Sequence, residues 1–131
     1  MERVFLDANV LFSAAYLDDS GLLRLWKLRD VQLVTSGYAV AEAAGNLDTP
    51  DRRRTLESLL ASVLVMQESD EASAIPPGVK LPPKDRPILD AAIRAGASFL
   101  LTGDRRHFGD YFGIRIGGVT ILPPADYLRT R

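Results

Sequence analysis

The stretch of residues 84–108, KDRPILDAAIRAGASFLLTGDRRHF, constrains the fold more than any other part of the sequence. Its apolar residues recur at helical spacing and predict a helix that opens on Asp85 and stops at Gly96. The nearly all-apolar run 98–102 predicts a strand that is buried on both faces of a parallel sheet and ends in a turn carrying Asp104. The helix descends from the carboxyl edge of such a sheet and the strand returns to that edge, so Asp85 and Asp104 should become neighbours.

Two more acids lie in similar contexts earlier in the chain. Residues 3–6 (RVFL) predict a strand, and Asp7 follows it directly, at the same edge. Residues 31–35 (VQLVT) predict a second strand, and Ser36 can cap a following helix over 38–47 that contains Glu42. With a rise of about 1.5 Å per residue, Glu42 should lie ~9 Å below the edge. Geometry alone therefore leaves open whether Glu42 joins the other acids.

The remaining segments complete an alternation of helices and strands. Helical spacing over 21–28 predicts core packing, and Thr49 can cap a helix whose first turn holds Pro50. Four further segments are assigned by pattern: strands at 63–67 and 119–122, a helical turn at 105–112 and an exposed, proline-rich loop at 68–83. This alternation predicts a three-layer α/β/α sandwich with a mainly parallel central sheet, in a single domain spanning residues 1–131.

Composition narrows the chemistry available to these acids. The chain has no cysteine and a single histidine, His107, which excludes disulfides, thiolate metal sites and zinc centres built on several histidines. Oxygen ligands remain, and they favour Mg²⁺ or Mn²⁺. A net charge of -1 gives no global signal for nucleic-acid binding. No apolar run reaches the ~18 residues of a membrane span and no signal peptide is evident, so we expect a cytoplasmic protein with no membrane partner.

Asp7, Asp85 and Asp104 each have an ordinary structural explanation, because aspartate is common after strands and at helix N-caps. As a group they are harder to explain. Two carboxylates ~4 Å apart repel by about 4 kcal/mol at an effective dielectric near 20, so a close group needs a cation, a shared proton or neighbouring arginines. A divalent metal held there would activate water and stabilise charge on a phosphodiester, which is nuclease chemistry. Whether one ion or two is bound stays open.

The same residues resemble the motifs of the PIN domain family, in particular the PIN-like toxins of bacterial toxin-antitoxin systems, which include VapC-type ribonucleases. Four acids match the family's positions in order: Asp7 in FLDANVLF, Glu42 in AVAEAAGNL, Asp85 in KDRPILDAAI and Asp104 in LLTGD. The resemblance implies that all four are catalytic and hold the metal, which also places Glu42 in the group. It further implies that Asn9 and Thr102 orient the acids or waters.

The resemblance implies a metal-dependent endoribonuclease that cleaves single-stranded RNA. It further implies that the protein is the toxin of a toxin-antitoxin pair, that a small antitoxin protein binds it, and that it forms a homodimer. Arg105 and Arg106 either contact RNA phosphates or lie in a solvent-exposed turn with no contact to substrate, and both alternatives stay open. For His107 we favour the solvated turn. Asp90 falls where similar proteins more often carry a small or apolar residue. Five residues along a helix turn it away from Asp85, so it should pair with Arg94 instead. Two alternatives stay open: a catalytically silent PIN-fold module that binds RNA or protein, and a structure-specific DNA nuclease, which the short chain disfavours.

Overall fold

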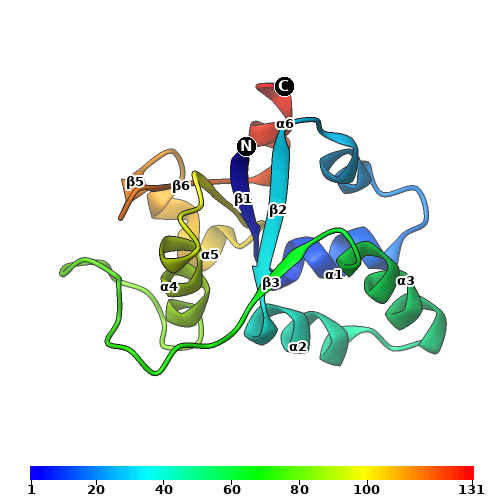
Figure 1. Ribbon diagram of the computed structural model, residues 1–131, viewed down its shortest axis with the longest axis horizontal. Helices are drawn as coiled ribbons and strands as arrows, with labels where there is room; N and C mark the ends of the chain where they lie inside the picture. The colour runs from blue at the N-terminus through cyan, green and yellow to red at the C-terminus, as the bar shows by residue number, and fades with distance from the viewer.

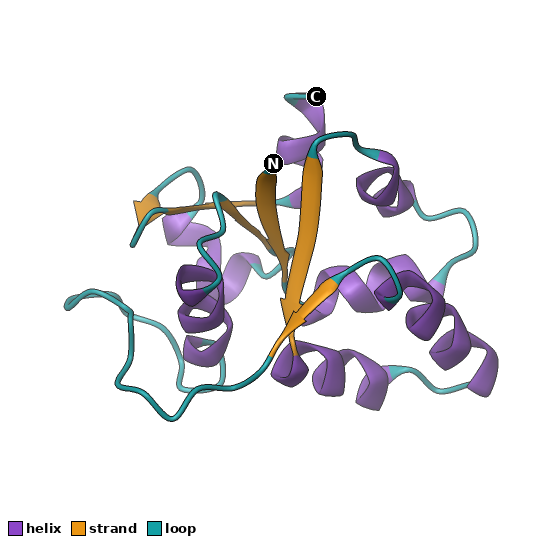
Figure 2. Cartoon of the chain, in the orientation of Figure 1, coloured by secondary structure: helices purple, strands orange, loops and turns teal.

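The computed structural model describes all 131 residues as one twisted sheet with helices on both faces (Figure 1). Helices α1 (Ala8–Tyr16) and α3 (Pro50–Leu60) lie on one side of the sheet, and α4 (Arg86–Arg94) lies on the other, together with α5 (Arg105–Phe108). Figure 2 shows the same layers coloured by type of element. The predicted α/β/α sandwich is confirmed.

The sheet has six strands in the order β3-β2-β1-β4-β6-β5, and every pair except β5 with β6 is parallel. The strands are β1 (Glu2–Leu6), β2 (Val31–Ser36), β3 (Leu64–Met66), β4 (Phe99–Leu101), β5 (Arg115–Ile116) and β6 (Val119–Leu122). Strand β1 lies in the middle, and its residues Val4, Phe5 and Leu6 are fully buried. This burial explains why residues 4–6 are all apolar, without alternation.

The register of β1 and β4 brings two predicted site segments together. Leu6 pairs with Leu101, so the residues that follow each strand, Asp7 and Thr102, leave the sheet side by side. The backbone N–H of Asp7 donates to the carbonyl oxygen of Leu101 at 3.1 Å. Asp7, which follows β1, and Asp104, which follows β4, therefore lie at the same edge of the sheet, as the sequence predicts.

Helix starts follow the predicted capping residues. Ser36 caps α2 (Gly37–Asn46) by accepting a hydrogen bond from the Ala39 N–H at 3.2 Å, and Thr49 caps α3 by accepting from the Arg52 N–H at 3.2 Å. The other helical segments are η1 (Gly21–Lys27), η2 (Gly109–Tyr111) and α6 (Pro124–Arg129). The predicted core packing of residues 21–28 is confirmed, because Leu25 is 1% exposed. None of the helices is both long and apolar enough to cross a membrane.

Three features differ from the sequence-based expectations. Strand β5 and helix α6 were not predicted, because a two-residue strand and a helix that begins after two prolines leave little periodic signal. The segment 68–83 is not wholly exposed. Ile75 is buried, and the Ala74 N–H donates to Asp90 Oδ1 at 2.6 Å. Asp90 also pairs with Arg94 Nε at 2.8 Å, which confirms the predicted pair.

Candidate functional site

All four acids singled out from the sequence line one cavity of about 850 Å³ at the carboxyl edge of the sheet. Asp7 follows β1, Asp104 follows β4, Asp85 immediately precedes α4, and Glu42 lies in α2. The structure thus brings together residues that are far apart in the sequence. Their catalytic and metal-binding roles stay predictions.

Asp7 is buried at 5% exposure, and both of its carboxylate oxygens accept hydrogen bonds. Oδ1 accepts from the Ala8 N–H at 2.6 Å, which caps α1. Oδ2 accepts from Thr102 Oγ1 at 2.8 Å and from Asn9 Nδ2 at 3.2 Å. These contacts fix the carboxylate in one orientation.

Burial nevertheless raises the pKa of Asp7 to about 6. Hydrogen bonds from Thr102 and Ala8 pull the pKa down, and the charges of Glu42 and Asp85 push it up further. Without a cation, Asp7 is therefore harder to ionise in the folded protein than in water, even though both of its oxygens accept hydrogen bonds.

Thr102 and Asn9 connect Asp7 to the segment that carries Asp104. Thr102 is fully buried, and its Oγ1 accepts from the Asp104 N–H at 3.1 Å while it donates to Asp7. Asn9 Nδ2 donates to Thr102 Oγ1 at 3.2 Å, and Asn9 Oδ1 accepts from the Gly103 N–H at 2.8 Å. Both side chains contact the residues that the resemblance has them orient. Their orienting role itself stays a prediction.

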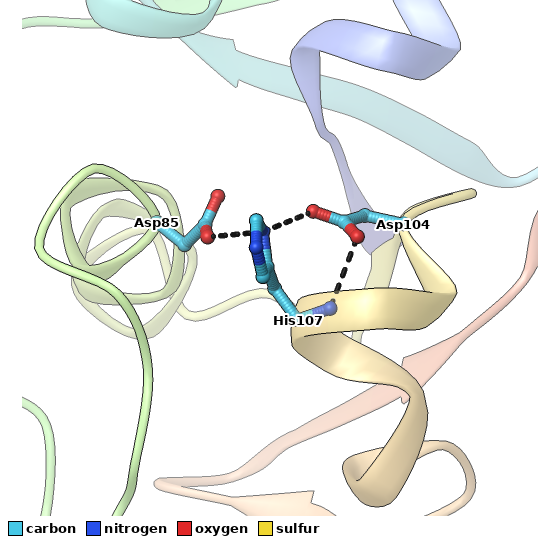
Figure 3. A group of neighbouring side chains, drawn as sticks. All are labelled: Asp85, Asp104 and His107. Carbon is cyan, nitrogen blue, oxygen red and sulfur yellow. Dashed lines mark hydrogen bonds and ion pairs between the residues drawn. The ribbon is translucent and has the colours of Figure 1, made fainter.

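Asp85 and Asp104 meet at the imidazole of His107 (Figure 3). Nδ1 of His107 lies 2.8 Å from Asp104 Oδ2 and 2.9 Å from Asp85 Oδ2. The expectation that His107 stays in a solvated turn is wrong, since its side chain is only 22% exposed and contacts both acids. The local signal was the spacing: a residue three positions after an N-cap aspartate has its backbone N–H, and here also its ring, beside that carboxylate.

Asp85 has an unusual environment for a carboxylate. The residue is 8% exposed, and its Oδ2 accepts no hydrogen bond. Burial raises the pKa of Asp85; the nearby His107 and Lys84 lower it and Asp104 raises it. A buried carboxylate oxygen that accepts no hydrogen bond and shares its imidazole neighbour with a second carboxylate favours a bound cation. Oxygens of Asp85 and Asp104 and a nitrogen of His107 lie within 4.8 Å of one another, a donor set that fits a divalent metal.

Glu42 is exposed and its carboxylate has no hydrogen-bond partner within the protein. It nevertheless borders the shared cavity, one helical turn before Asn46, which lines it too. The charge of Glu42 also raises the pKa of Tyr38, after burial as the main cause. Helix α2 therefore directs Glu42 toward the space that the other acids share, which distance along the helix alone could not establish.

The two arginines that are candidates for RNA contacts are not among the residues that line the cavity. Arg105 and Arg106 are exposed on α5, directly after Asp104. Lys84 is the cationic residue in the lining, and no sequence pattern marked it. Contact of Arg105 and Arg106 with RNA stays a prediction.

Comparison with known families decides the assignment. A family model described as PIN domain matches residues 3–106, most of the chain. The chain belongs to the PIN domain family. The matched range contains Asp7, Glu42, Asp85 and Asp104 but ends one residue before His107. The histidine that joins two of the acids thus lies beyond the part matched to this PIN domain family.

Solved structures of low sequence identity share the fold. VapBC2 from Rickettsia felis, bound to a DNA fragment from its promoter, is 15% identical, with a TM-score of 0.64 over 92% of this chain and 98% of that chain. VapC20 from Mycobacterium tuberculosis, a sarcin-ricin loop cleaving toxin, is 14% identical, with a TM-score of 0.58 over 86% and 98%. FitAB bound to an IR36 DNA fragment is 18% identical, with a TM-score of 0.57 over 92% and 94%. Among curated proteins, no sequence matches.

Proposed function

We propose that this PIN domain protein is a metal-dependent endoribonuclease that cleaves single-stranded RNA and acts as the toxin of a toxin-antitoxin pair. One observation carries the proposal: Asp85 and Asp104 converge in the cavity that also contains Asp7 and Glu42, and Asp85 Oδ2 is buried there without a hydrogen bond. Structural aspartates at caps and turns are normally satisfied by hydrogen bonds. Four converging acids, one of which has a buried oxygen without a hydrogen bond, instead fit a site that binds a cation.

The residues present fit Mg²⁺ or Mn²⁺, which Asp85 and Asp104 would hold together with Asp7 and Glu42. When bound, the ion supplies a stronger nucleophile from water and stabilises negative charge on the phosphodiester. Asp7 is already fixed by its three hydrogen bonds, so its charge needs no reorientation during the reaction. Glu42, exposed and free of hydrogen bonds, is able to bind and orient a water molecule.

A second groove supports a nucleic-acid substrate. This groove, of about 660 Å³, adjoins the acid cavity, because Leu22 and Ala125 line both. Arg24, Arg129 and Arg131 also line it. Arg129 and Arg131 are ion-paired with neighbouring acids, whereas Arg24 is exposed and has no ion pair. A strand leaving the acid cavity through this groove would place its phosphates beside these arginines, the contacts that supply affinity independent of sequence.

The toxin assignment rests on the shared fold. VapC20 is a sarcin-ricin loop cleaving toxin, and VapBC2 and FitAB are proteins of the same fold bound to DNA fragments. We infer that this chain has a small antitoxin protein as partner and that it forms a homodimer. Light scattering of the purified chain, alone and with the product of an adjacent small reading frame, tests both assemblies.

Cleavage of a mixed single-stranded RNA pool tests the catalytic proposal. Wild type should cleave with Mn²⁺ and stop when a chelator is added, and Asp85→Asn should not cleave. Asp90→Asn is the matched control, because Asp90 lies on the same helix but is partnered by Arg94 and Ala74. RNA binding without cleavage in any metal would contradict the proposal and favour a silent binding module. Cleavage restricted to flap or branched DNA would replace RNA as the substrate.

A further inference from the structure

His107 brings a nitrogen donor into a site that the family's motifs build from carboxylates alone. Its Nδ1 lies 2.8 Å from Asp104 Oδ2 and 2.9 Å from Asp85 Oδ2, so the two oxygens approach the same nitrogen. Nδ1 carries at most one hydrogen, so the two oxygens compete for a single donor. It is hydrogen-bonded to Asp104, and Asp85 Oδ2 accepts no hydrogen bond. One ring nitrogen therefore serves two carboxylates.

The backbone holds His107 in place for this contact. The His107 N–H donates to Asp104 Oδ1 at 3.0 Å, so Asp104 caps α5 with one oxygen and turns the other toward the imidazole ring. Phe108, the next residue, is fully buried and anchors the short helix in the core. The ring is therefore preorganised on a packed element, as metal ligands are.

We infer that His107 is a metal ligand through Nδ1 and that, with Asp85 and Asp104, it makes the site prefer Mn²⁺ to Mg²⁺. The inference rests on the proposed function, which requires a metal at these acids. The three donor atoms lie within 4.8 Å of one another. The buried Asp85 Oδ2, which accepts no hydrogen bond, independently indicates a place for a cation. The Nδ1 proton leaves to solvent when the nitrogen binds the ion.

The preference follows from ligand chemistry. Mg²⁺ is bound by oxygen and keeps several waters, whereas imidazole nitrogen is a common ligand for transition metals. A site of carboxylates alone would hold both ions through the same oxygens. Adding one imidazole therefore strengthens Mn²⁺ binding more than Mg²⁺ binding, and removing it should reverse that gain.

Pulsed EPR of wild-type protein with Mn²⁺ tests the ligand directly, because a coordinated imidazole gives ¹⁴N modulation from the directly bound nitrogen. Calorimetry on His107→Ala should show Mn²⁺ affinity lowered by about tenfold or more, with a much smaller change for Mg²⁺. His107→Gln, which offers an oxygen in place of the nitrogen, should bind both ions and lack the ¹⁴N signal. The wild-type spectrum keeps the test decisive even if a variant misfolds.

The outcomes separate this inference from the function on which it rests. Mn²⁺ bound to wild type without directly coordinated ¹⁴N, together with an unchanged ratio of Mn²⁺ to Mg²⁺ affinity in His107→Ala, would overturn the role of His107 and leave the metal-dependent nuclease intact. Wild type that binds neither ion would overturn both.

Discussion

The two halves of the acid cavity hold their carboxylates in opposite ways. In the first half, both oxygens of Asp7 accept hydrogen bonds, from Ala8, Asn9 and Thr102. In the second half, Asp85 Oδ2 has no hydrogen bond and faces the same imidazole nitrogen as Asp104. The difference indicates that the fold itself fixes the orientation of Asp7 in the first half; in our proposal, a cation completes the second half.

Helix α4 repeats the contrast within two turns. Asp85, just before its start, has a buried oxygen without a hydrogen bond, whereas Asp90 accepts hydrogen bonds from Ala74 and Arg94. Asp90 holds the segment before α4 against the helix, so it stabilises the fold. The same residue type therefore serves structure at one position and a candidate metal site five residues earlier.

Substitution of these two acids should have the largest and most opposite effects. Asp85→Asn should lower cleavage by roughly 100-fold or more, because a ligand is lost, and leave the metal-free free energy of unfolding unchanged or raised. Asp90→Asn should retain cleavage and lower the free energy of unfolding by about 1–3 kcal/mol, because it breaks a partnered network. Urea titrations beside the RNA cleavage assay measure both. An equal fall in the free energy of unfolding of the two variants would show that Asp85, like Asp90, stabilises the fold.

Asp7 should make the metal-free protein less stable as pH rises. Its pKa is raised from 3.8 to about 6, so the folded state binds the proton more tightly than the unfolded chain does. The stabilisation is complete below pH 3.8 and is lost as pH rises through 6, by about 3 kcal/mol at 1.36 kcal/mol per pKa unit. Denaturant titrations in chelator from pH 4 to 8 should show this fall. Asp7→Asn should flatten it, and an equally steep fall in that variant would assign it to other groups.

The hydrogen bonds of Thr102 in the first half of the cavity should contribute to the free energy of unfolding. Thr102→Val removes the hydroxyl that donates to Asp7 and accepts from the Asp104 N–H, and should lower the free energy of unfolding by about 1–3 kcal/mol. Thr102→Ser keeps the hydroxyl and should recover part of that loss. Thermal melts of the two variants provide the comparison. A valine variant as stable as the serine variant would show that the hydrogen bonds do not hold this half together.

The smallest effect, on RNA binding, is expected for the arginines of the second groove, the basic groove lined by Arg24, Arg129 and Arg131. Arg24→Ala should weaken single-stranded RNA binding modestly and reduce the slope of log affinity against log salt by about 0.7, one phosphate contact. Arg106→Ala, on exposed α5, is the comparison for the sequence-based proposal. Filter binding over a series of salt concentrations distinguishes the two variants. Both also carry Asp85→Asn, so that the RNA is not cleaved. An unchanged slope for Arg24→Ala would exclude the groove as the path of the strand.

Local patterns were enough to predict most of the fold. The cap residues Ser36 and Thr49, the buried run of β4 and the acids after β1 and β4 are all encoded over a few residues, and each lies where predicted. Strand β5 was missed because it exists only through pairing with β6. The turn between them depends on Gly117, at φ 58°, where a Cβ would come within 2.8 Å of Ile93 Cδ1.

The site could be predicted only in part, because half of it depends on tertiary packing. Asp7, Asp85 and Asp104 follow from strand ends and helix starts. The position of Glu42 depends on how α2 leans over the cavity, and the contact of His107 with Asp85 depends on α5 packing beside α4. The basic groove likewise exists only because α6 packs against η1. None of these three contacts has a signature within a short stretch of sequence.

Thermal unfolding of wild type with and without Mn²⁺ tests most directly whether the converging acids form a metal site. At a hundred times the dissociation constant, Mn²⁺ should stabilise wild type by about 2.7 kcal/mol, because the ion binds the folded cavity and hardly the unfolded chain. Asp85→Asn should lose most of this gain while its metal-free melting temperature stays equal or rises. If wild type shows no shift with Mn²⁺ and Asp85→Asn melts well below it, the acids are capping and turn residues, and the nuclease proposal is wrong.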